Sequence, residues 1–278
     1  MTRRRPALAA GTLLLFTVFL AAVGSRAQLA APFVVTDARD VALMMRVADV
    51  GPGDYLVDLG SGDGRIVIAA AERGALAHGV EIDPALVLRA GARARAAGVA
   101  DRTAFVEGDL FEADLSGATV LTLYLFPEAM LRLRPKILES LAPGTRVLSN
   151  SFDFGEWKPD RHLESASSGG LLLWIVPARV QGGWELRVDG RVLPLQLEQR
   201  FQEIEGSLVT GAEPSALEEP VLEGTRIRFA VSEGDERWRF SGTVNGSAMS
   251  GFVQRRAGGY VEPLSWTARR VDGEAVGP

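Results

Sequence analysis

A glycine-rich turn between an apolar run and a helix-like segment constrains the fold of this chain more than any other feature. The apolar run Tyr55 to Leu59 is followed by Gly-Ser-Gly-Asp-Gly at residues 60–64, and the segment from Arg65 to Arg73 has helical character. Glycine lets the backbone turn sharply and come close to a ligand, because no side chain blocks the approach. The free N–H groups at the start of a helix point into the same space. The sequence therefore predicts a strand, a ligand-binding turn and a helix.

Apolar runs and helix-like segments alternate through the first half of the chain. Helices are expected over 36–50, 65–73, 83–95 and 128–141, and strands over 55–59, 77–82, 103–106, 119–125, 146–152 and 171–176. Strands that alternate with helices through short connections form a parallel sheet with helices on both faces. The fold class expected for residues 28–179 is therefore α/β, with a doubly wound, mostly parallel and Rossmann-like sheet.

The second half of the chain shows a different pattern. No helical periodicity is found from Gly183 onward, and segments such as 226–229 and 237–240 place apolar residues at every second position. Glycine-containing turns accompany this alternation, which is typical of antiparallel strands with one solvated face. A smaller antiparallel all-β module is expected over 180–270, followed by a tail at 271–278. The turns lie at 189–190, 245–246 and 258–259.

The N-terminus is organised like a secretory signal peptide. Three arginines at 3–5 precede the apolar run 7–23, and Ser25-Arg26-Ala27 places small residues at both positions that a signal peptidase reads. Cleavage before Gln28 is expected, which makes residues 1–27 a signal peptide. The alternative is an uncleaved membrane anchor, for which the run is short because a span needs about 20 apolar residues. In both cases the preceding positive charge places the body outside the cytoplasm, exported or close to a membrane.

Composition excludes several classes of site. The chain has no cysteine, which rules out disulfides, thiolate zinc sites and cysteine nucleophiles, and with two histidines we expect no metal site. The net charge is −5, and removing the four positive charges of Arg3, Arg4, Arg5 and Arg26 leaves −9. A body this acidic, without a compact basic cluster, is not expected to bind nucleic acid.

The spacing of the turn separates two classes of ligand, dinucleotides and S-adenosylmethionine. A dinucleotide fingerprint needs glycine at 60, 62 and 65, because helix and strand pack closely at the third position, and this chain has Arg65 there. The acid at Asp63 would also oppose a pyrophosphate, whereas it suits a ligand that carries an ammonium and a sulfonium. S-adenosylmethionine is therefore the predicted cofactor.

Two downstream acids fit the same ligand. Glu81 is placed at the end of the second strand, where a carboxylate can accept hydrogen bonds from both ribose hydroxyls, and Asp109 follows the third strand, where it could accept from an adenine amino group. Each acid taken singly has a simpler interpretation as a helix cap or turn residue. Acids at the ends of three consecutive strands, however, indicate one crevice. The residues expected to bind the cofactor are Asp58, Gly60, Ser61, Gly62, Glu81 and Asp109.

Several segments of the chain resemble one known family. They cover residues 57–68, 79–83, 123–125, 133–138 and 143–147. Together they look like the small class I methyltransferases that include archaeal and mitochondrial protein-lysine methyltransferases and their bacterial homologues. The resemblance covers roughly residues 33–177. It implies transfer of a methyl group from S-adenosylmethionine to an amine, with Tyr124 as the catalytic residue beside the methyl group and most of the cofactor-binding residues above as its contacts.

The loop after the fifth strand departs from that family. The relatives often read Ser-His-Asp-Phe where this chain has Ser-Asn-Ser-Phe at 149–152. The loop lies near the substrate channel, so the identity of the methyl acceptor, lysine included, stays open. Asp153 and Trp157 are further channel candidates, although an aromatic residue at the position of Trp157 is more often a packing residue.

Two functional hypotheses remain. In the first, an amine is methylated; a lysine acceptor must arrive neutral, and an apolar wall such as residues 123–127 lowers the pKa of an amine. The Tyr124 hydroxyl could orient that amine, or Tyr124 could simply be a buried strand aromatic. In the second, an exported and non-catalytic protein keeps the fold as a scaffold while the β module recognises an envelope component. The second is motivated by the signal peptide, because the cofactor is made in the cytoplasm.

Overall fold

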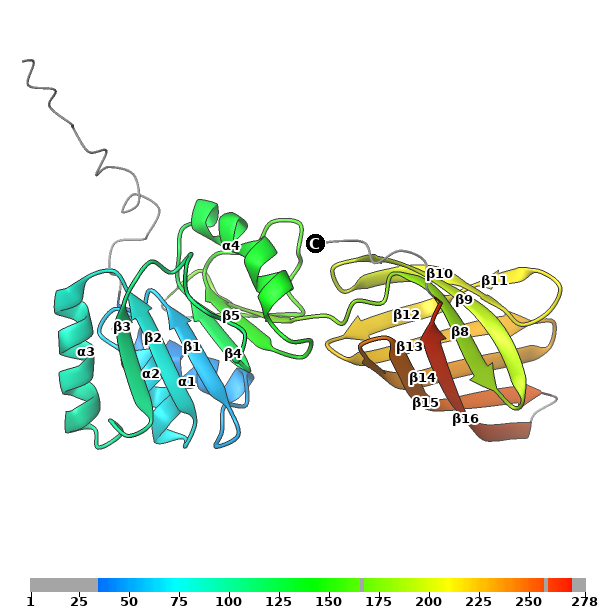
Figure 1. Cartoon of the computed structure of the whole chain (residues 1–278), viewed down its shortest axis with the longest axis horizontal. Coiled ribbons are helices and arrows are strands. Elements are labelled where there is room, and N and C mark those ends of the chain that lie inside the picture. The colour runs from blue at the N-terminus through cyan, green and yellow to red at the C-terminus, as the bar shows by residue number, and fades with distance from the viewer. Residues whose placement is uncertain (1–34, 166–167, 258–259, 272–278) are drawn as a thin grey trace, which may run out of the picture.

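The computed structural model describes residues 35–165, 168–257 and 260–271, which form two domains that lie side by side (Figure 1). The first domain contains the helices and a seven-stranded sheet, and the second is all-β. The predicted signal peptide falls outside the described residues. No helix in the described ranges combines the length and the apolar character that crossing a membrane requires.

The first domain is built on a sheet with the strand order β3-β2-β1-β4-β5-β7-β6. Strands β1 to β5 run parallel, whereas β7 is antiparallel to β5 and β6. The predicted mostly parallel α/β sheet is thus confirmed. The order of the strands reverses between β1 and β4, and ligands bind beyond the carboxyl ends of the strands at such a point. The strands are β1 (Tyr55–Leu59), β2 (Leu76–Glu81), β3 (Thr103–Glu107), β4 (Val120–Leu123), β5 (Arg146–Asn150), β6 (Arg161–Leu163) and β7 (Leu171–Ile175).

Helices cover both faces of this sheet, α1 and α2 behind it and α4 in front in the view of Figure 1. Successive strand residues point to opposite faces: Leu56 belongs to the core under α1 and α2, and Val57 to the core under α4. Local signals start the helices, for example at α3, where Asp83 accepts a hydrogen bond from the Ala85 N–H and Pro84 occupies the first turn. The helices are α1 (Ala38–Val47), α2 (Arg65–Glu72), α3 (Pro84–Ala96) and α4 (Pro127–Ser140).

Two strands end earlier than the sequence predicts. The strand expected over 119–125 ends at Leu123, and the strand expected over 146–152 ends at Asn150. Beyond these points the chain leaves the sheet at its carboxyl edge. Leu125 then packs against Gly60 of the glycine-rich turn, and Phe152 packs against Tyr124, rather than inside the sheet. Hydrophobic pattern does not distinguish these two environments. The three-residue strand β6 was not predicted, because its sequence, Arg-His-Leu, is short and polar.

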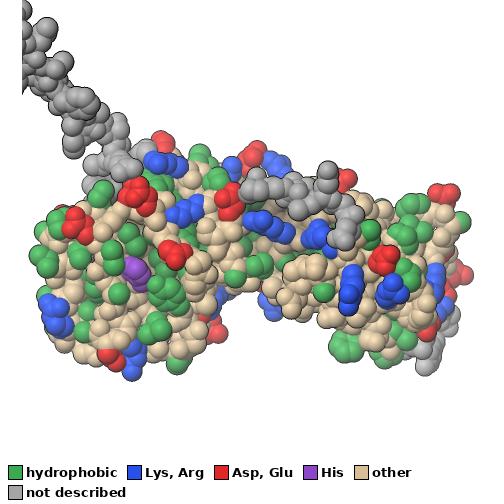
Figure 2. Space-filling model, viewed as in Figure 1, with side chains coloured by type: hydrophobic (Ala, Val, Ile, Leu, Met, Phe, Trp, Pro, Cys, Tyr) green, Lys and Arg blue, Asp and Glu red, His purple; other side chains and the backbone are tan. Residues whose placement is uncertain are grey.

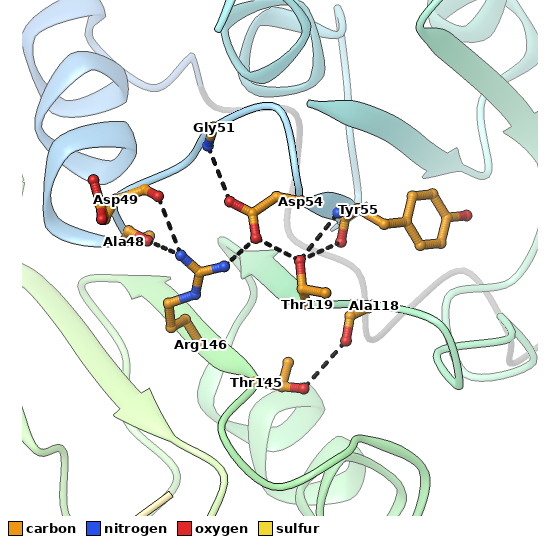
Figure 3. Close-up of polar contacts among 9 residues, drawn as sticks. All are labelled: Ala48, Asp49, Gly51, Asp54, Tyr55, Ala118, Thr119, Thr145 and Arg146. Atoms are coloured by element: carbon orange, nitrogen blue, oxygen red, sulfur yellow. Dashed lines mark hydrogen bonds and ion pairs between the residues drawn. The ribbon is translucent and has the colours of Figure 1, made fainter. Parts of the chain in front are cut away.

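The opposite edge of the sheet is closed by a polar network (Figure 3). Arg146, at the start of β5, pairs with Asp54 and donates to the carbonyls of Ala48 and Asp49 at the end of α1. Thr119 donates a 2.7 Å hydrogen bond to the same carboxylate. The network therefore joins β1, β4 and β5 to α1 on the side of the sheet that lies away from the turn.

The second domain is one antiparallel sheet with the strand order β11-β10-β9-β8-β16-β15-β14-β13-β12. The two ends of the sheet approach each other, β10 against β12 and β11 against β13, so the sheet is rolled into a barrel-like body. Its interior is filled by aliphatic and aromatic side chains, including Trp184, Trp238 and Trp266. The strands are β8 (Gly182–Val188), β9 (Arg191–Arg200), β10 (Glu203–Val209), β11 (Pro214–Ala216), β12 (Glu218–Glu223), β13 (Arg226–Glu233), β14 (Glu236–Asn245), β15 (Ala248–Ala257) and β16 (Tyr260–Arg270).

Candidate active site

The glycine-rich turn lies at the carboxyl ends of β1 and β2. The N–H groups of Gly60 and Ser61 both donate to the Val80 carbonyl, at 2.9 and 3.1 Å. All three glycines of the turn adopt positive φ angles, a region that other residues enter only at a cost. At Gly64 space is limiting as well, because a Cβ atom there would lie 2.7 Å from the Phe105 ring. The turn thus requires glycine for its backbone and for its packing against β3.

Asp58 is a buried acid next to this turn. Its side chain is 3% exposed and accepts a 2.7 Å hydrogen bond from the Thr122 hydroxyl. Burial raises the pKa of Asp58 from 3.8 to about 7, the Thr122 hydrogen bond opposes this, and the charges of Glu81 and Asp63 add to the increase. No arginine or lysine of the described ranges forms an ion pair with it. A cationic group of a ligand would favour the ionised form of this carboxyl.

Ser61 contributes a buried hydroxyl at the same turn. Its Oγ atom makes no hydrogen bond to any residue that the structure describes. Gly79 lies opposite, and a Cβ atom at Gly79 would come within 2.5 Å of this oxygen. A buried hydroxyl without a partner costs free energy unless a water molecule or a ligand satisfies it. The turn therefore fits a ligand that carries polar groups.

Glu81 ends β2 and is held by backbone N–H groups. Its Oε2 atom accepts from Gly62 at 2.9 Å, and its Oε1 atom accepts from Ile82 at 2.8 Å and from Asp83 at 3.0 Å. These bonds orient the carboxylate at the edge of the turn. A carboxylate has about four acceptor positions, so one remains for a ligand hydroxyl. A second hydroxyl would have to replace one of the three N–H donors.

Asp109 lies in the segment that follows β3, and this segment is close to Glu81. The Gly108 N–H donates to the Glu81 carbonyl at 3.0 Å, which places the two acids on neighbouring strands. Asp109 Oδ1 accepts a 2.9 Å hydrogen bond from the Phe111 N–H, so the residue stabilises a turn with one oxygen. The structure thus brings Asp58, Glu81 and Asp109 to one edge of the sheet.

Asp63 was expected to favour a cationic ligand, but its charge is already balanced by two arginines. Asp63 is 2% exposed and is bound by Arg65 in a two-point ion pair, with Nε to Oδ1 at 2.9 Å and the second nitrogen to Oδ2 at 2.7 Å. Arg93 also pairs with it. Burial alone would raise the pKa of Asp63, but the hydrogen bonds and charges of these arginines lower it. Its charge is compensated by the protein, whereas Asp58, which is equally buried, has no ion pair within the described residues.

The segment after β4 adjoins the turn. Leu59 of β1 pairs with Leu123 of β4, so Tyr124 follows next to Gly60. Leu125 packs against that glycine, with its Cδ2 atom 3.4 Å from the position of a Cβ. The predicted cofactor turn and the predicted apolar wall are therefore neighbours in space.

Tyr124 is half-buried and lies beyond the end of β4, so it is not a buried strand aromatic. Its ring stacks on Phe152, with centroids 6.4 Å apart and planes 30° apart, and Phe126 approaches the Phe152 ring from another side at 6.3 Å. Trp157 is fully buried and stacks on Phe154 at 5.2 Å, so it is a packing residue, in agreement with its sequence interpretation.

Thr122, Gly79 and Phe152 also contribute to the site, although the sequence alone did not assign a role to their side chains or positions. A polar residue in an apolar strand and a glycine inside a strand were visible signals for the first two. Phe152 lies in the loop that the resemblance places near the substrate channel, but the strand predicted over 146–152 included it, so no role was assigned to its ring. Asp153, a channel candidate, is exposed and accepts a hydrogen bond from the Gly155 N–H at 2.9 Å, so it shapes the loop instead.

Comparison with known proteins agrees with this geometry. Residues 58–161 match the model of the ANTKMT methyltransferase domain. A protein-lysine N-methyltransferase of Saccharolobus islandicus is 41% identical over 130 residues, which are 46% of this chain and 81% of that protein. The adenine nucleotide translocase lysine N-methyltransferase of Mus musculus is 35% identical over 133 residues, which are 48% of this chain and 58% of that protein.

A solved structure matches the first domain. It is described as an RNA methyltransferase from Salinibacter ruber in complex with S-adenosyl-L-homocysteine, and it is 50% identical, with a TM-score of 0.51 over 53% of this chain and 96% of that one. That ligand is the cofactor product of methyl transfer. The chain accordingly belongs to the family of S-adenosylmethionine-dependent methyltransferases that includes the archaeal protein-lysine N-methyltransferase, and its first domain is the methyltransferase domain.

Proposed function

We propose that this enzyme methylates the side-chain amine of a lysine in a protein. One observation carries the proposal: the apolar and aromatic wall formed by Tyr124, Phe126 and Phe152 adjoins the cofactor turn at Gly60. The matched relatives that are named lysine methyltransferases support the same acceptor.

The residues of the turn fit S-adenosylmethionine. When bound, this cofactor supplies an electrophilic methyl group on a sulfonium. In our proposal Asp58 balances the positive charge of the cofactor's ammonium group, Glu81 accepts from the ribose, and Asp109 accepts from the adenine amino group. Gly60, Ser61 and Gly62 line the turn by their backbone and the Ser61 hydroxyl. These roles follow from the burial of Asp58 and from the free acceptor positions of the other two acids.

The acceptor side would bring the amine into its reactive state. A lysine amine has a reference pKa of about 10.4, and only its neutral form has a free electron pair. Apolar surroundings disfavour the ammonium form and so lower the amine pKa. The wall around Tyr124 provides such surroundings, and the Tyr124 hydroxyl, which makes no hydrogen bond within the described part of the chain, can accept from the amine and orient it.

RNA is the second candidate acceptor, because the Salinibacter ruber protein is described as an RNA methyltransferase. The charge of this chain argues against it, since the sequence carries −9 once the four N-terminal arginines are removed. On the face shown in Figure 2, acidic and basic side chains are interspersed over the first domain rather than gathered into a basic patch. Protein is therefore the acceptor we propose.

Transfer of a labelled methyl group tests this choice. The purified enzyme and its Asp58→Asn variant are incubated with tritiated S-adenosylmethionine and a bacterial lysate, which is then treated with protease or with nuclease. We expect that protease releases the label and nuclease does not, and that acid hydrolysis of the labelled material yields methyl-lysine. The Asp58→Asn variant should incorporate no label. Label in the nuclease-sensitive fraction, or none in either fraction while S-adenosylhomocysteine still binds, would contradict the proposal.

We also propose that the enzyme works outside the cytoplasm, on the basis of the signal-peptide pattern at residues 1–27. Cell fractionation followed by mass spectrometry of the N-terminal peptide tests this. A mature chain that starts at Gln28 in the exported fraction is expected, and a cytoplasmic chain that starts at Met1 would contradict it.

A further inference from the structure

The turn between β9 and β10 connects the second domain to the loop after β5. Three consecutive residues, 200–202, each contact one residue of the loop segment 156–158. The contacts are an ion pair of 2.8 Å between Arg200 and Glu156, a ring stack between Phe201 and Trp157 with centroids 6.2 Å and planes 20° apart, and a 2.7 Å hydrogen bond from Gln202 Nε2 to the Lys158 carbonyl.

Phe201 adopts an unusual backbone conformation at this contact. Its φ angle is +57°, in the left-handed region that a bulky residue enters only when its surroundings offset the cost. Its ring contacts both the Trp157 indole and the guanidinium of Arg134, which is 5.5 Å from the ring centroid. Glycine would suit the backbone better at this position, so the ring is the reason for phenylalanine here.

The far end of the same loop reaches the acceptor side of the site. Phe152, at the start of the loop, stacks on Tyr124, whereas Phe154 and Trp157 are fully buried in the core of the first domain. Arg134 donates to the Phe154 carbonyl at 2.9 Å while its guanidinium faces Phe201. The loop is thus a packed aromatic connection between the second domain and Tyr124.

Within the described residues, the acids of the cofactor side have no such connection to the second domain. The hydrogen-bond partners that the structure gives Asp58, Glu81 and Asp109 all belong to the first domain, on β1 to β4 and the turns that follow them. A change at Phe201 can therefore affect the acceptor side while the cofactor side keeps its contacts.

We propose that Phe201 is a positioning residue, through which the second domain holds the 151–160 loop so that Phe152 lies against Tyr124. The second domain in this view controls acceptor geometry. The inference rests on the proposed function for its activity readout, but its structural readout does not depend on the identity of the acceptor.

The test compares Phe201→Gly with two controls in the full-length protein. Phe201→Gly removes the ring and relieves the backbone, so it should not impair folding of the β9–β10 turn. Phe201→Tyr keeps the ring, and Phe252→Ala removes a 69% exposed aromatic from the same domain. The acceptor-independent readout is nitration of Tyr124 by tetranitromethane, measured by mass spectrometry relative to Tyr55. The other readouts are calorimetric binding of S-adenosylhomocysteine and methyl transfer to poly-L-lysine.

In Phe201→Gly we expect faster nitration of Tyr124 relative to Tyr55 and unchanged binding of S-adenosylhomocysteine. Transfer to poly-L-lysine should lose about tenfold in kcat/KM for the acceptor, the scale of one lost aromatic contact, with an unchanged KM for S-adenosylmethionine. Both controls should behave like the wild type. Unchanged nitration, unchanged transfer, or an equal loss of cofactor binding would overturn the proposal. A wild type that binds cofactor but never methylates lysine would instead refute the proposed function, with the nitration result still deciding the role of Phe201.

Discussion

Thr122 donates a 2.7 Å hydrogen bond to Asp58 from the position directly opposite it on the neighbouring strand. Both side chains are buried, and the bond partly opposes the effect of burial, which leaves the pKa of Asp58 at about 7. A carboxyl with this pKa is divided between its neutral and charged forms at neutral pH. A ligand that presents a positive charge to Asp58 has to shift it toward the charged form.

Cofactor binding should therefore depend on pH. The ammonium group that S-adenosylmethionine and S-adenosylhomocysteine share selects ionised Asp58, so binding releases a proton below the pKa of about 7. We expect the affinity for S-adenosylhomocysteine to rise by up to about tenfold per pH unit from pH 5.5 toward 7 and to level off above it. Calorimetry in two buffers with different ionisation heats measures the proton release. An affinity that does not change between pH 5.5 and 7, without proton release on binding, would exclude Asp58 as the residue that balances the charge of the ligand.

Thr122→Val should move this pH dependence upward. The hydroxyl stabilises the ionised carboxyl, and its removal raises the pKa of Asp58 further. At pH 7 we expect roughly tenfold weaker binding of S-adenosylhomocysteine, in the range of one hydrogen bond to a charged group. Thr122→Ser keeps the hydroxyl and is the matched control. Equal binding by the valine and serine variants at pH 7 would show that the bond has no role in binding.

Replacing the two buried acids of the turn region, Asp58 and Asp63, by asparagine should have opposite effects on the stability of the protein. Folding raises the pKa of Asp58, so its effect on stability is most favourable below pH 4 and is lost as the pH rises through about 7. Asp58→Asn should therefore keep or raise the melting temperature at pH 8 while it weakens cofactor binding by about 30-fold or more. Thermal unfolding and calorimetry check both effects, and a large loss of stability would contradict the first.

Asp63→Asn is the counterpart of that variant. It leaves Arg65 and Arg93 without their shared carboxylate, so it should lower the free energy of unfolding by roughly 1–3 kcal/mol. Because Asp63 is compensated within the protein, cofactor affinity should fall less than in Asp58→Asn. The opposite ranking of the two variants in the binding measurement would restore Asp63 as the ligand's charge partner.

Arg146→Met should change stability without changing binding. Arg146 pairs with Asp54 at the edge of the sheet away from the turn (Figure 3), and its removal should cost on the order of 1–3 kcal/mol. Burial raises the pKa of Asp54, but hydrogen bonds from Thr119 and Gly51 and the charge of Arg146 lower it below 3.8. The stability from this lowered pKa is present above pH 3.8 and is lost as the pH falls through the folded pKa of Asp54. The stability difference between wild type and variant should therefore narrow in acid, where the bonds of Arg146 to the Ala48 and Asp49 carbonyls remain. Denaturant unfolding at pH 7 and pH 3 measures this, and weaker binding of S-adenosylhomocysteine by the variant at pH 7 would contradict it.

Much of the fold and of the cofactor side could be predicted because the signals are local. Tyr55–Leu59 was predicted with its observed bounds, and the glycines after it adopt the positive φ angles that the turn needs. The acceptor side was harder. Phe152 was assigned to a strand, since an apolar side chain looks the same in sequence whether it faces a core or a ligand channel.

By itself, the sequence determined the order of strands and helices, the change to an all-β domain and the place of the cofactor turn, because hydrophobic period and glycine conformation are properties of neighbouring residues. Only the tertiary structure decided which acid keeps an uncompensated charge. Asp63 pairs with Arg65, two residues away, and also with Arg93, 30 residues away, whereas Asp58 meets a neutral hydroxyl 64 residues away. The contact of Phe201 with Trp157 is of the same kind, because it exists only where the two domains pack together.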